Sequence, residues 1–166
     1  GGFLLAIAIQ KWDLHKRIAL FVLERAGSNG ASLVLGFMLT AAVISMWVMN
    51  TATTIMLLPI GLAVVTVVKE TVKGLSEKET ENFQLSLLLG IAYGATIGGM
   101  STLIGTGPNG MLAAFMADNY DLDISFIDWM KVGVPLSAIM LPSSWFVLTR
   151  IIYPVRFKTS EETRAL

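Results

Sequence analysis

Two long stretches without a charged side chain limit what this chain can fold into more than any other feature. They are Ala31–Val68 and Phe83–Ala117. As one straight helix, the first would be about 57 Å long at a rise of roughly 1.5 Å per residue. That length is nearly twice the roughly 30 Å hydrocarbon core of a bilayer, so we expect the chain to turn or break inside each stretch.

The low charge content places these stretches in lipid. Only 14% of the residues are charged, whereas about 25% is usual for a soluble domain. A third uncharged stretch, Val132–Thr149, has the length of a membrane span. The sequence therefore predicts an all-α membrane protein, and its formal net charge of zero gives no indication of a nucleic-acid partner.

The first stretch is interrupted by Met49-Asn50-Thr51-Ala52-Thr53-Thr54. Asparagine and threonine side chains offer the backbone alternative hydrogen bonds and tolerate helix ends, so we predict the turn at Asn50–Thr54. A turn at the far membrane surface would usually carry glycine, proline or charge. We therefore interpret residues 31–68 as a re-entrant helical hairpin whose tip lies inside the membrane, where it must contact protein or a wet cavity.

The second stretch is interrupted by the segment from Gly98 to Gly110, which is rich in glycine, threonine and asparagine. We interpret residues 83–117 as a broken transmembrane helix and 132–154 as a further transmembrane helix. The other segments are predicted as 1–30, the end of a transmembrane helix followed by an interfacial amphipathic helix; 69–82, a cytoplasmic linker; 118–131, an external loop or short helix; and 155–166, a polar tail.

The distribution of basic residues favours one orientation. If the hairpin returns to its own side and the broken helix crosses once, eleven of the twelve basic residues share a side, and only Lys131 lies opposite. Basic loops are enriched in the cytoplasm, so these loops are predicted to be cytoplasmic. Two full crossings of the first stretch would give the same distribution.

The residues at the two breaks suggest a binding site for a small anion and a coupling cation. Asn50 offers a carbonyl oxygen, and Thr51, Thr53 and Thr54 offer hydroxyls. Hard cations prefer such oxygens, and helix N-termini beyond a break attract carboxylates. The alternative is a threonine-rich kink whose hydroxyls bond their own helix. No Ser-His-Asp set, metal-ligand cluster or carboxylate pair indicates an enzyme, and the Gly105–Gly110 loop lacks the Lys-Ser/Thr of a phosphate loop.

At these same two breaks the sequence resembles the divalent anion:sodium symporter family, solute carrier family 13. Ser45 to Thr54, followed by Met56-Leu57-Leu58-Pro59-Ile60, is similar to that family's hairpin signature. Gly98-Gly99 and Leu103 to Asn109 are similar to its broken-helix signature, and Gly1–Leu20 is similar to its interfacial helix. The resemblance covers nearly the whole chain, but only the first of the family's two inverted repeats.

The resemblance implies roles for particular residues. Ser45, Asn50 and Gly105 would hold a sodium ion, and Asn50, Thr51 and Thr106 would face the substrate carboxylate. It also implies a homodimer with an elevator-like motion, no cofactor, and a site completed by the second repeat of the same protein or by a complementary chain.

Two positions depart from the family pattern. Met49 stands where the hairpin signature has serine, which removes a hydroxyl from the expected sodium shell, and Gly107 stands where proline is frequent. The resulting hypothesis is sodium-coupled secondary transport of di- or tricarboxylates of the succinate, malate or citrate type, in the inner membrane of a prokaryote. A sodium-independent anion exchanger, proton coupling, or a non-transporting truncated membrane subunit are the alternatives.

Overall fold

The computed structural model describes residues 29–72 and 74–157, and it confirms the all-α class predicted from the sequence. The expected end of a transmembrane helix and the interfacial helix before residue 29, and the polar tail from residue 158, lie outside the described residues. The helices are α3 (Gly30–Ser45), α4 (Asn50–Thr71), α5 (Glu77–Met100), α6 (Gly107–Tyr120) and α7 (Phe126–Phe146), which continues as the π-helix η1 (Val147–Ile152).

Helices α3 and α4 form a hairpin whose tip, Met46–Met49, lies one residue before the predicted turn. The prediction of a turn at Asn50–Thr54 was wrong, because those residues open α4 instead. The backbone N–H groups of Trp47 and Val48 both donate to the carbonyl of Ile44, which closes the end of α3. Asn50 then marks the first turn of a helix rather than the loop itself.

The segment between α4 and α5 is shorter than the predicted linker 69–82. Helix α4 continues to Thr71, and α5 begins at Glu77. A capping box fixes this start: Ser76 Oγ accepts from the Glu79 backbone N–H, and the Glu79 carboxylate accepts from the Ser76 N–H at 3.0 Å. Two orphan donors at the start of α5 are thereby satisfied, so the helix extends six residues earlier than the uncharged stretch suggested.

The predicted external segment 118–131 is likewise mostly helical. Helix α6 runs to Tyr120 and ends at Asp121, whose φ of 52° places it in the left-handed region. Helix α7 begins after Ser125, whose hydroxyl accepts from the Asp128 N–H at 3.2 Å. Only residues 121–125 remain as a connection, because both helix ends are satisfied locally.

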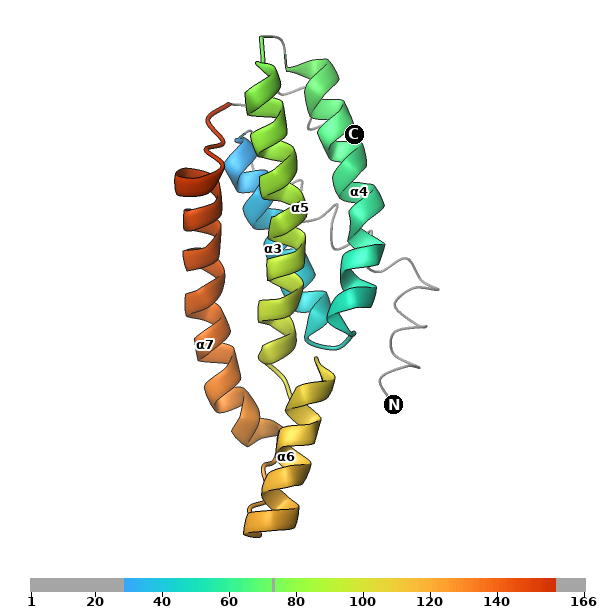
Figure 1. Ribbon diagram of the computed structural model, residues 1–166, viewed down its shortest axis with the longest axis vertical. Helices are drawn as coiled ribbons and strands as arrows, with labels where there is room; N and C mark the ends of the chain where they lie inside the picture. The colour runs from blue at the N-terminus through green and yellow to red at the C-terminus, as the bar shows by residue number, and fades with distance from the viewer. Residues whose placement is uncertain (1–28, 73, 158–166) are drawn as a thin grey trace.

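The helices lie roughly side by side, with α3 packed chiefly against α5 (Figure 1). The start of α3, the end of α4, the start of α5 and η1 share one end of the bundle, which we call the charged end because it carries Lys69, Lys78, Arg150 and Arg156. The hairpin tip lies near the level at which α5 ends, while α6 and the start of α7 extend beyond it. The hairpin therefore reaches only part of the way along the bundle.

Two glycines bring the backbones of α3 and α5 together. A Cβ atom at Gly94 would clash with the Met38 backbone, and one at Gly98 with the Ala42 backbone. Small residues at helix contacts permit this close approach in membrane proteins. Around the contact, the buried core includes Phe37 and Ile91.

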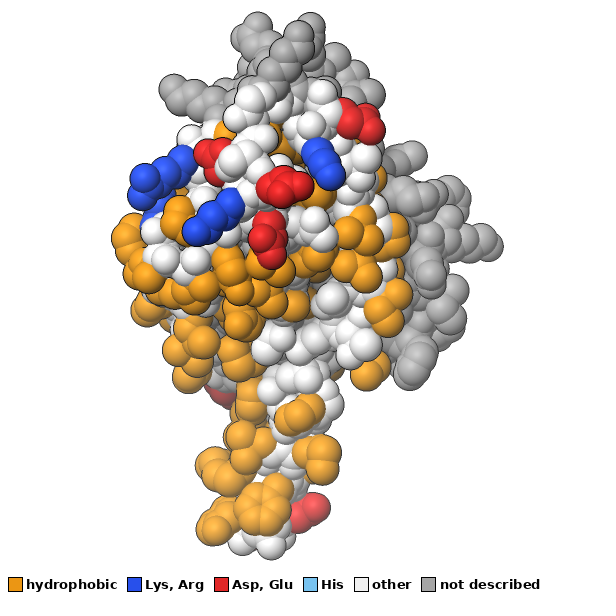
Figure 2. Space-filling view, turned by 45° about the horizontal axis from the view of Figure 1, so that its top comes forward, with side chains coloured by type: hydrophobic (Ala, Val, Ile, Leu, Met, Phe, Trp, Pro, Cys, Tyr) orange, Lys and Arg blue, Asp and Glu red, His pale blue; other side chains and the backbone are white. Residues whose placement is uncertain are grey.

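Within residues 29–72 and 74–157, three helices are long and apolar enough to cross a membrane: Asn50–Glu70, Glu77–Met100 and Phe126–Ile152. Large apolar side chains are exposed along them, as at Ile139, which is 68% exposed. Figure 2 shows charged side chains gathered at the charged end and an apolar band beside them. This arrangement is typical of helices surrounded by lipid, and the chain is an integral membrane protein.

We expect Gly98→Ala to lower stability by about 1–3 kcal/mol, because the added methyl group forces α3 away from α5. The measurement is the thermal unfolding midpoint of the full-length protein in detergent. Gly110→Ala is the control, since a Cβ atom there meets nothing within 4 Å. Equal midpoints for the two variants would contradict the close contact.

Candidate functional site

Helix α5 ends inside the bundle, at Met100, and resumes as α6 only at Gly107. We call the intervening segment, Ser101–Thr106, the helix break. The last four carbonyl groups of an α-helix have no partner within the helix. An unpaired carbonyl buried away from water carries a free-energy penalty of several kcal/mol on hydrocarbon transfer scales, about 4–8. These four carbonyls therefore determine whether a helix can end at this depth.

Each of these four carbonyls accepts a hydrogen bond from outside the regular helix. Two of the donors belong to α7, one belongs to α6, and one is Ser101 directly after the helix. The bonds are Ser137 Oγ to Ile97 O at 2.8 Å, Ser101 N to Gly98 O at 3.0 Å, Asn109 Nδ2 to Gly99 O at 3.0 Å, and Trp129 Nε1 to Met100 O at 3.0 Å. Two of the four bonds thus come from side chains of α7 that lie 40 and 29 residues away in sequence.

The hairpin tip contacts the helix break directly. The hydroxyl of Thr102, which is fully buried, donates to the Met46 carbonyl at 2.6 Å. On the other side of the tip, the amide of Asn50 lies so close to Gly99 that a Cβ atom on this glycine would clash with it. The two interruptions therefore meet, and their polar groups share one small volume.

The three residues predicted to hold sodium lie together at this contact. Ser45 Oγ donates to Asn50 Oδ1 at 2.8 Å, and Ser45 is fully buried. A Cβ atom at Gly105 would lie 2.5 Å from Gly99 O and 2.9 Å from Ser45 O, so glycine is required here. The last residue of α3, the first of α4 and the helix break thus supply neutral oxygen atoms to one place.

The chemistry of this group suits a hard cation. Its donors are hydroxyl, amide and carbonyl oxygens, which such cations prefer. Thr53, three residues after Asn50 on α4, carries a hydroxyl oxygen that is buried and has no hydrogen-bond partner. Met49, in contrast, is 58% exposed, and its soft sulfur is a poor ligand for a hard cation.

The predicted substrate residues occupy the N-termini of two helices. Thr51 is exposed in the first turn of α4, and Thr106 is the half-buried residue that precedes α6. Neither helix start has a side-chain cap, so the first N–H groups of α4 remain available. Of the first three residues of α6, only Gly107 retains a free N–H, because Pro108 has none and the Asn109 N–H donates to the Thr106 carbonyl at 3.2 Å. Within the described residues no hydrogen bond joins Thr51 to Thr106. Asn50 is the one residue that belongs both to the predicted sodium ligands and to the predicted substrate residues.

Sequence reasoning missed the residues that support the break. Asn109 and Thr102 belong to the polar segment itself, but the pattern gave no sign that their side chains tie the break to α5 and the tip. Ser137 and Trp129 lie in a different helix, 40 and 29 residues from the carbonyls that they bind. A serine and a tryptophan in an apolar helix were the available signal, because each needs a partner when buried.

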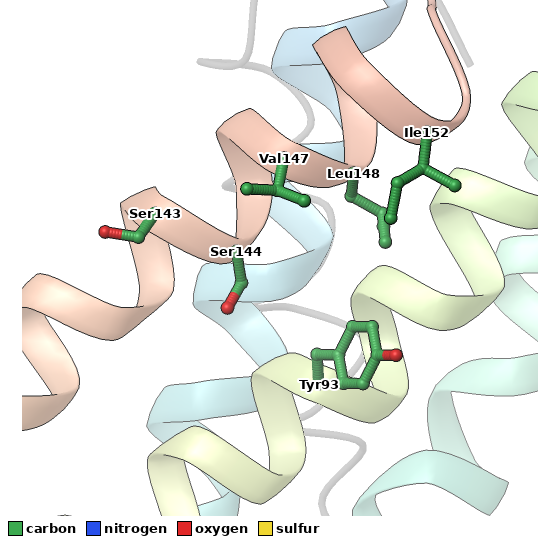
Figure 3. Close-up of a pocket in the computed structure, with 6 residues that line it drawn as sticks. All are labelled: Tyr93, Ser143, Ser144, Val147, Leu148 and Ile152. Atoms are coloured by element: carbon green, nitrogen blue, oxygen red, sulfur yellow. The ribbon is translucent and has the colours of Figure 1, made fainter.

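An open groove elsewhere on the bundle is distinct from this site. It lies between α5 and the end of α7 (Figure 3). Its lining is mostly apolar: Tyr93, Ser143, Ser144, Val147, Leu148 and Ile152. The α7 residues that face the break are instead Trp129, Gly133 and Ser137, in the first half of the helix.

Comparison with known proteins identifies relatives over nearly the whole chain. A family model described as citrate transporter matches residues 1–164. The sodium-dependent dicarboxylate transporter SdcS of Staphylococcus aureus strain USA300 is 37% identical over 154 residues, 92% of this chain and 30% of the relative. SdcS of Staphylococcus saprophyticus is 38% identical over 160 residues, 96% of this chain and 31% of the relative. The chain therefore spans about 30% of the length of these curated relatives.

Removing the Asn109 amide should destabilise the break. Asn109→Leu keeps a similar volume but leaves the Gly99 carbonyl without its donor and removes a second bond, to Thr102 O. We expect a loss of about 1–3 kcal/mol for each carbonyl left unsatisfied. Thermal unfolding of the full-length protein in detergent measures this loss. Asn119→Leu is the control, because Asn119 is exposed; similar losses in both variants would contradict the role of Asn109.

Proposed function

The chain belongs to the citrate transporter family, and on this basis we propose that it is the part of a sodium-coupled carboxylate transporter that binds both the anion and the cation. One observation carries the proposal: the hairpin tip and the helix break meet, with Ser45 Oγ bonded to Asn50 Oδ1 at 2.8 Å beside Gly105. Because the chain spans about 30% of its relatives, the rest of the protein completes the site.

Sodium binds, in this proposal, to Ser45, Asn50 and Gly105. The relatives are named sodium-dependent transporters, which supports sodium as the coupling ion. All three residues offer neutral oxygens, and the hydroxyl of Ser45 is already oriented toward the Asn50 amide. A cation would take over the oxygen atoms that now bond to one another.

The substrate is a dicarboxylate or tricarboxylate. The relatives are named for dicarboxylates and the family model for citrate, so a carboxylate is common to both. The uncapped N-termini of α4 and α6 carry the partial positive charge that attracts such a group. Asn50, Thr51 and Thr106 contact it in this proposal.

The absence of charged side chains in the two long stretches explains why the ions would be coupled. An anion alone would enter a site without a compensating charge, and so would a cation. Opposite charges a few ångströms apart attract strongly where the effective dielectric constant is low. Each ion therefore raises the affinity for the other, which is the thermodynamic requirement for symport.

The orientation follows from the basic residues. Lys69, Lys78, Arg150 and Arg156 occupy the charged end, while Lys131, at the other end, forms an ion pair with Asp128 at 2.7 Å. The positive-inside rule then places the charged end in the cytoplasm of a prokaryote. The whole protein would contain a second, inverted repeat, form a homodimer, and expose the site alternately by an elevator-like motion.

The exchange mode is the second candidate, and Met49 is the observation that favours it. A methionine in place of the hydroxyl of the family signature weakens the cation shell. Uptake of labelled succinate and citrate by the full-length protein in proteoliposomes, with and without a sodium gradient, separates the two. Sodium-stimulated uptake supports symport, sodium-independent counterflow supports exchange, and no flux in any arrangement contradicts transport altogether.

Asn50→Ala should reduce sodium-driven uptake to background. It removes the oxygen that Ser45 bonds and an amide that we assign to both ions. Expression and folding should persist, because Ser45 Oγ keeps its bond to the Val48 carbonyl at 3.3 Å. Uptake in proteoliposomes is the measurement, with the exposed Asn119→Ala as control. Substantial uptake by Asn50→Ala would contradict the assigned site.

Met49→Ser should increase sodium affinity several-fold, because it returns a hydroxyl to the cation shell. A serine that caps α4 should also stabilise the protein by about 1 kcal/mol, since Met49 makes no side-chain cap bond. The sodium dependence of uptake tests the first effect and thermal unfolding without sodium tests the second. A stabilised variant with unchanged sodium dependence would show that this position lies outside the ion shell.

A further inference from the structure

Among the described helical threonines, Thr53 is buried and yet does not use its hydroxyl, whereas Thr51, which also makes no side-chain hydrogen bond, is exposed to solvent. Six other helical threonines donate to the carbonyl four residues earlier in the chain, at 2.8 to 3.2 Å. These six are Thr40, Thr54, Thr66, Thr80, Thr96 and Thr149. Thr53 is fully buried, yet its Oγ1 has no hydrogen-bond partner. A buried hydroxyl without a partner is destabilising, so its presence calls for a reason.

The position of Thr53 points to the site formed by the hairpin tip and the helix break. It lies three residues after Asn50 on α4, and residues at that spacing are neighbours on one face of a helix. Farther along the same face, Leu57 is fully buried and Gly61 lies against Ile91 of α5. This face of α4 therefore turns toward α5, and Thr53 lies one turn from the tip, beside Asn50.

A hydrogen-bond acceptor for the Thr53 hydroxyl lies nearby on the same helix, but the hydroxyl does not bond to it. The carbonyl of Met49, four residues earlier, accepts the backbone N–H of Thr53 at 3.0 Å, and it is the acceptor that the other threonines would choose. The Thr53 hydroxyl makes no hydrogen bond to it. The lone pairs and the proton of this buried hydroxyl are thus available to a bound ligand.

The neighbouring oxygen atoms indicate which class of ligand could bind the Thr53 hydroxyl. Asn50, three residues before Thr53 on α4, is half-buried, and its Oδ1 accepts from the buried Ser45 Oγ of α3 at 2.8 Å; both atoms are neutral oxygens. No acid or base lies in Ala31–Val68 to bind a polar solute by charge. Neutral oxygens converging at a buried place suit a hard monovalent or divalent cation.

We propose that Thr53 Oγ1 is a further ligand of the coupling cation, and that it supplies the hydroxyl that Met49 does not. This inference rests on the proposed sodium coupling. Met49 directs its side chain outward, where it is 58% exposed, so the shell lacks an oxygen on that side of the tip. Thr53, one turn farther along α4, offers one from within.

Sodium binding to the full-length protein in detergent tests the proposal. The readout is the rise of the thermal unfolding midpoint with sodium chloride, with choline chloride holding the ionic strength constant. A ligand that binds only the folded state raises this midpoint, and at a given ligand concentration the rise is larger for a tighter ligand. Thr53→Val keeps the shape of the side chain and removes the oxygen, so we expect about a tenfold weaker apparent affinity for sodium.

Two further variants make the result specific. Thr53→Ser keeps the oxygen and should bind sodium nearly as the parent does. Thr66→Val is the matched control on the same helix, because Thr66 is exposed and donates to the Leu62 carbonyl. Without sodium, Thr53→Val should unfold at the same temperature as the parent or higher, since it removes an unpartnered hydroxyl. If it fails to fold, Thr53→Ala against Thr53→Ser gives the same comparison.

The outcomes separate this proposal from the proposed function. A parent protein stabilised by sodium, with Thr53→Val stabilised equally, overturns the ligand role of Thr53 and leaves sodium coupling intact; the hydroxyl would then bind an internal water. A parent protein without any response to sodium overturns both. A weaker response in Thr53→Val alone, restored in Thr53→Ser, supports the assignment.

Discussion

The four carbonyls at the end of α5 are the constraint on which the rest of the structure depends. A helix that stops between others exposes them where no water competes, and irregular backbone is tolerated at such depth only if it is buried in protein or faces a wet cavity. Here Ser137 and Trp129 of α7, Asn109 of α6 and Ser101 satisfy them. These bonds fix α6 and α7 against α5, and the Thr102 bond to Met46 O then fixes the hairpin tip.

This arrangement separates two kinds of polar group. The terminal carbonyls of α5 each accept a supporting hydrogen bond, so the proposed cation site draws mainly on other oxygens, although a broken helix suggests these carbonyls as ligands. The oxygens that remain for an ion belong to side chains at the start of α4 and to the backbone beside Gly105. Binding would therefore exchange weak contacts among Ser45, Asn50 and their neighbours, and the supporting bonds of the break would stay intact.

The sequence predicted local features well and tertiary ones poorly. The uncharged stretches are a property of the sequence itself, so they were visible without a structure. The turn was misplaced because Asn50 is equally compatible with a loop and with the first turn of a helix. Nothing in the sequence distinguishes Thr53 from Thr51 and Thr54, since what differs among them is the direction of each side chain relative to α3 and α5. The roles assigned to Ser45, Asn50 and Gly105 remain predictions.

The glycines of α5 also determine how this part of the protein can move. At Gly94 and Gly98 the α3 backbone rests on the α5 backbone, without intervening side chains that could change rotamer or slide. Direct contact between two backbones leaves little room for one helix to move relative to the other. Helices α3 and α5 should consequently move as one rigid body. A displacement at the charged end would then produce an equal displacement at the hairpin tip, and the distances among the oxygen atoms at the tip would be preserved.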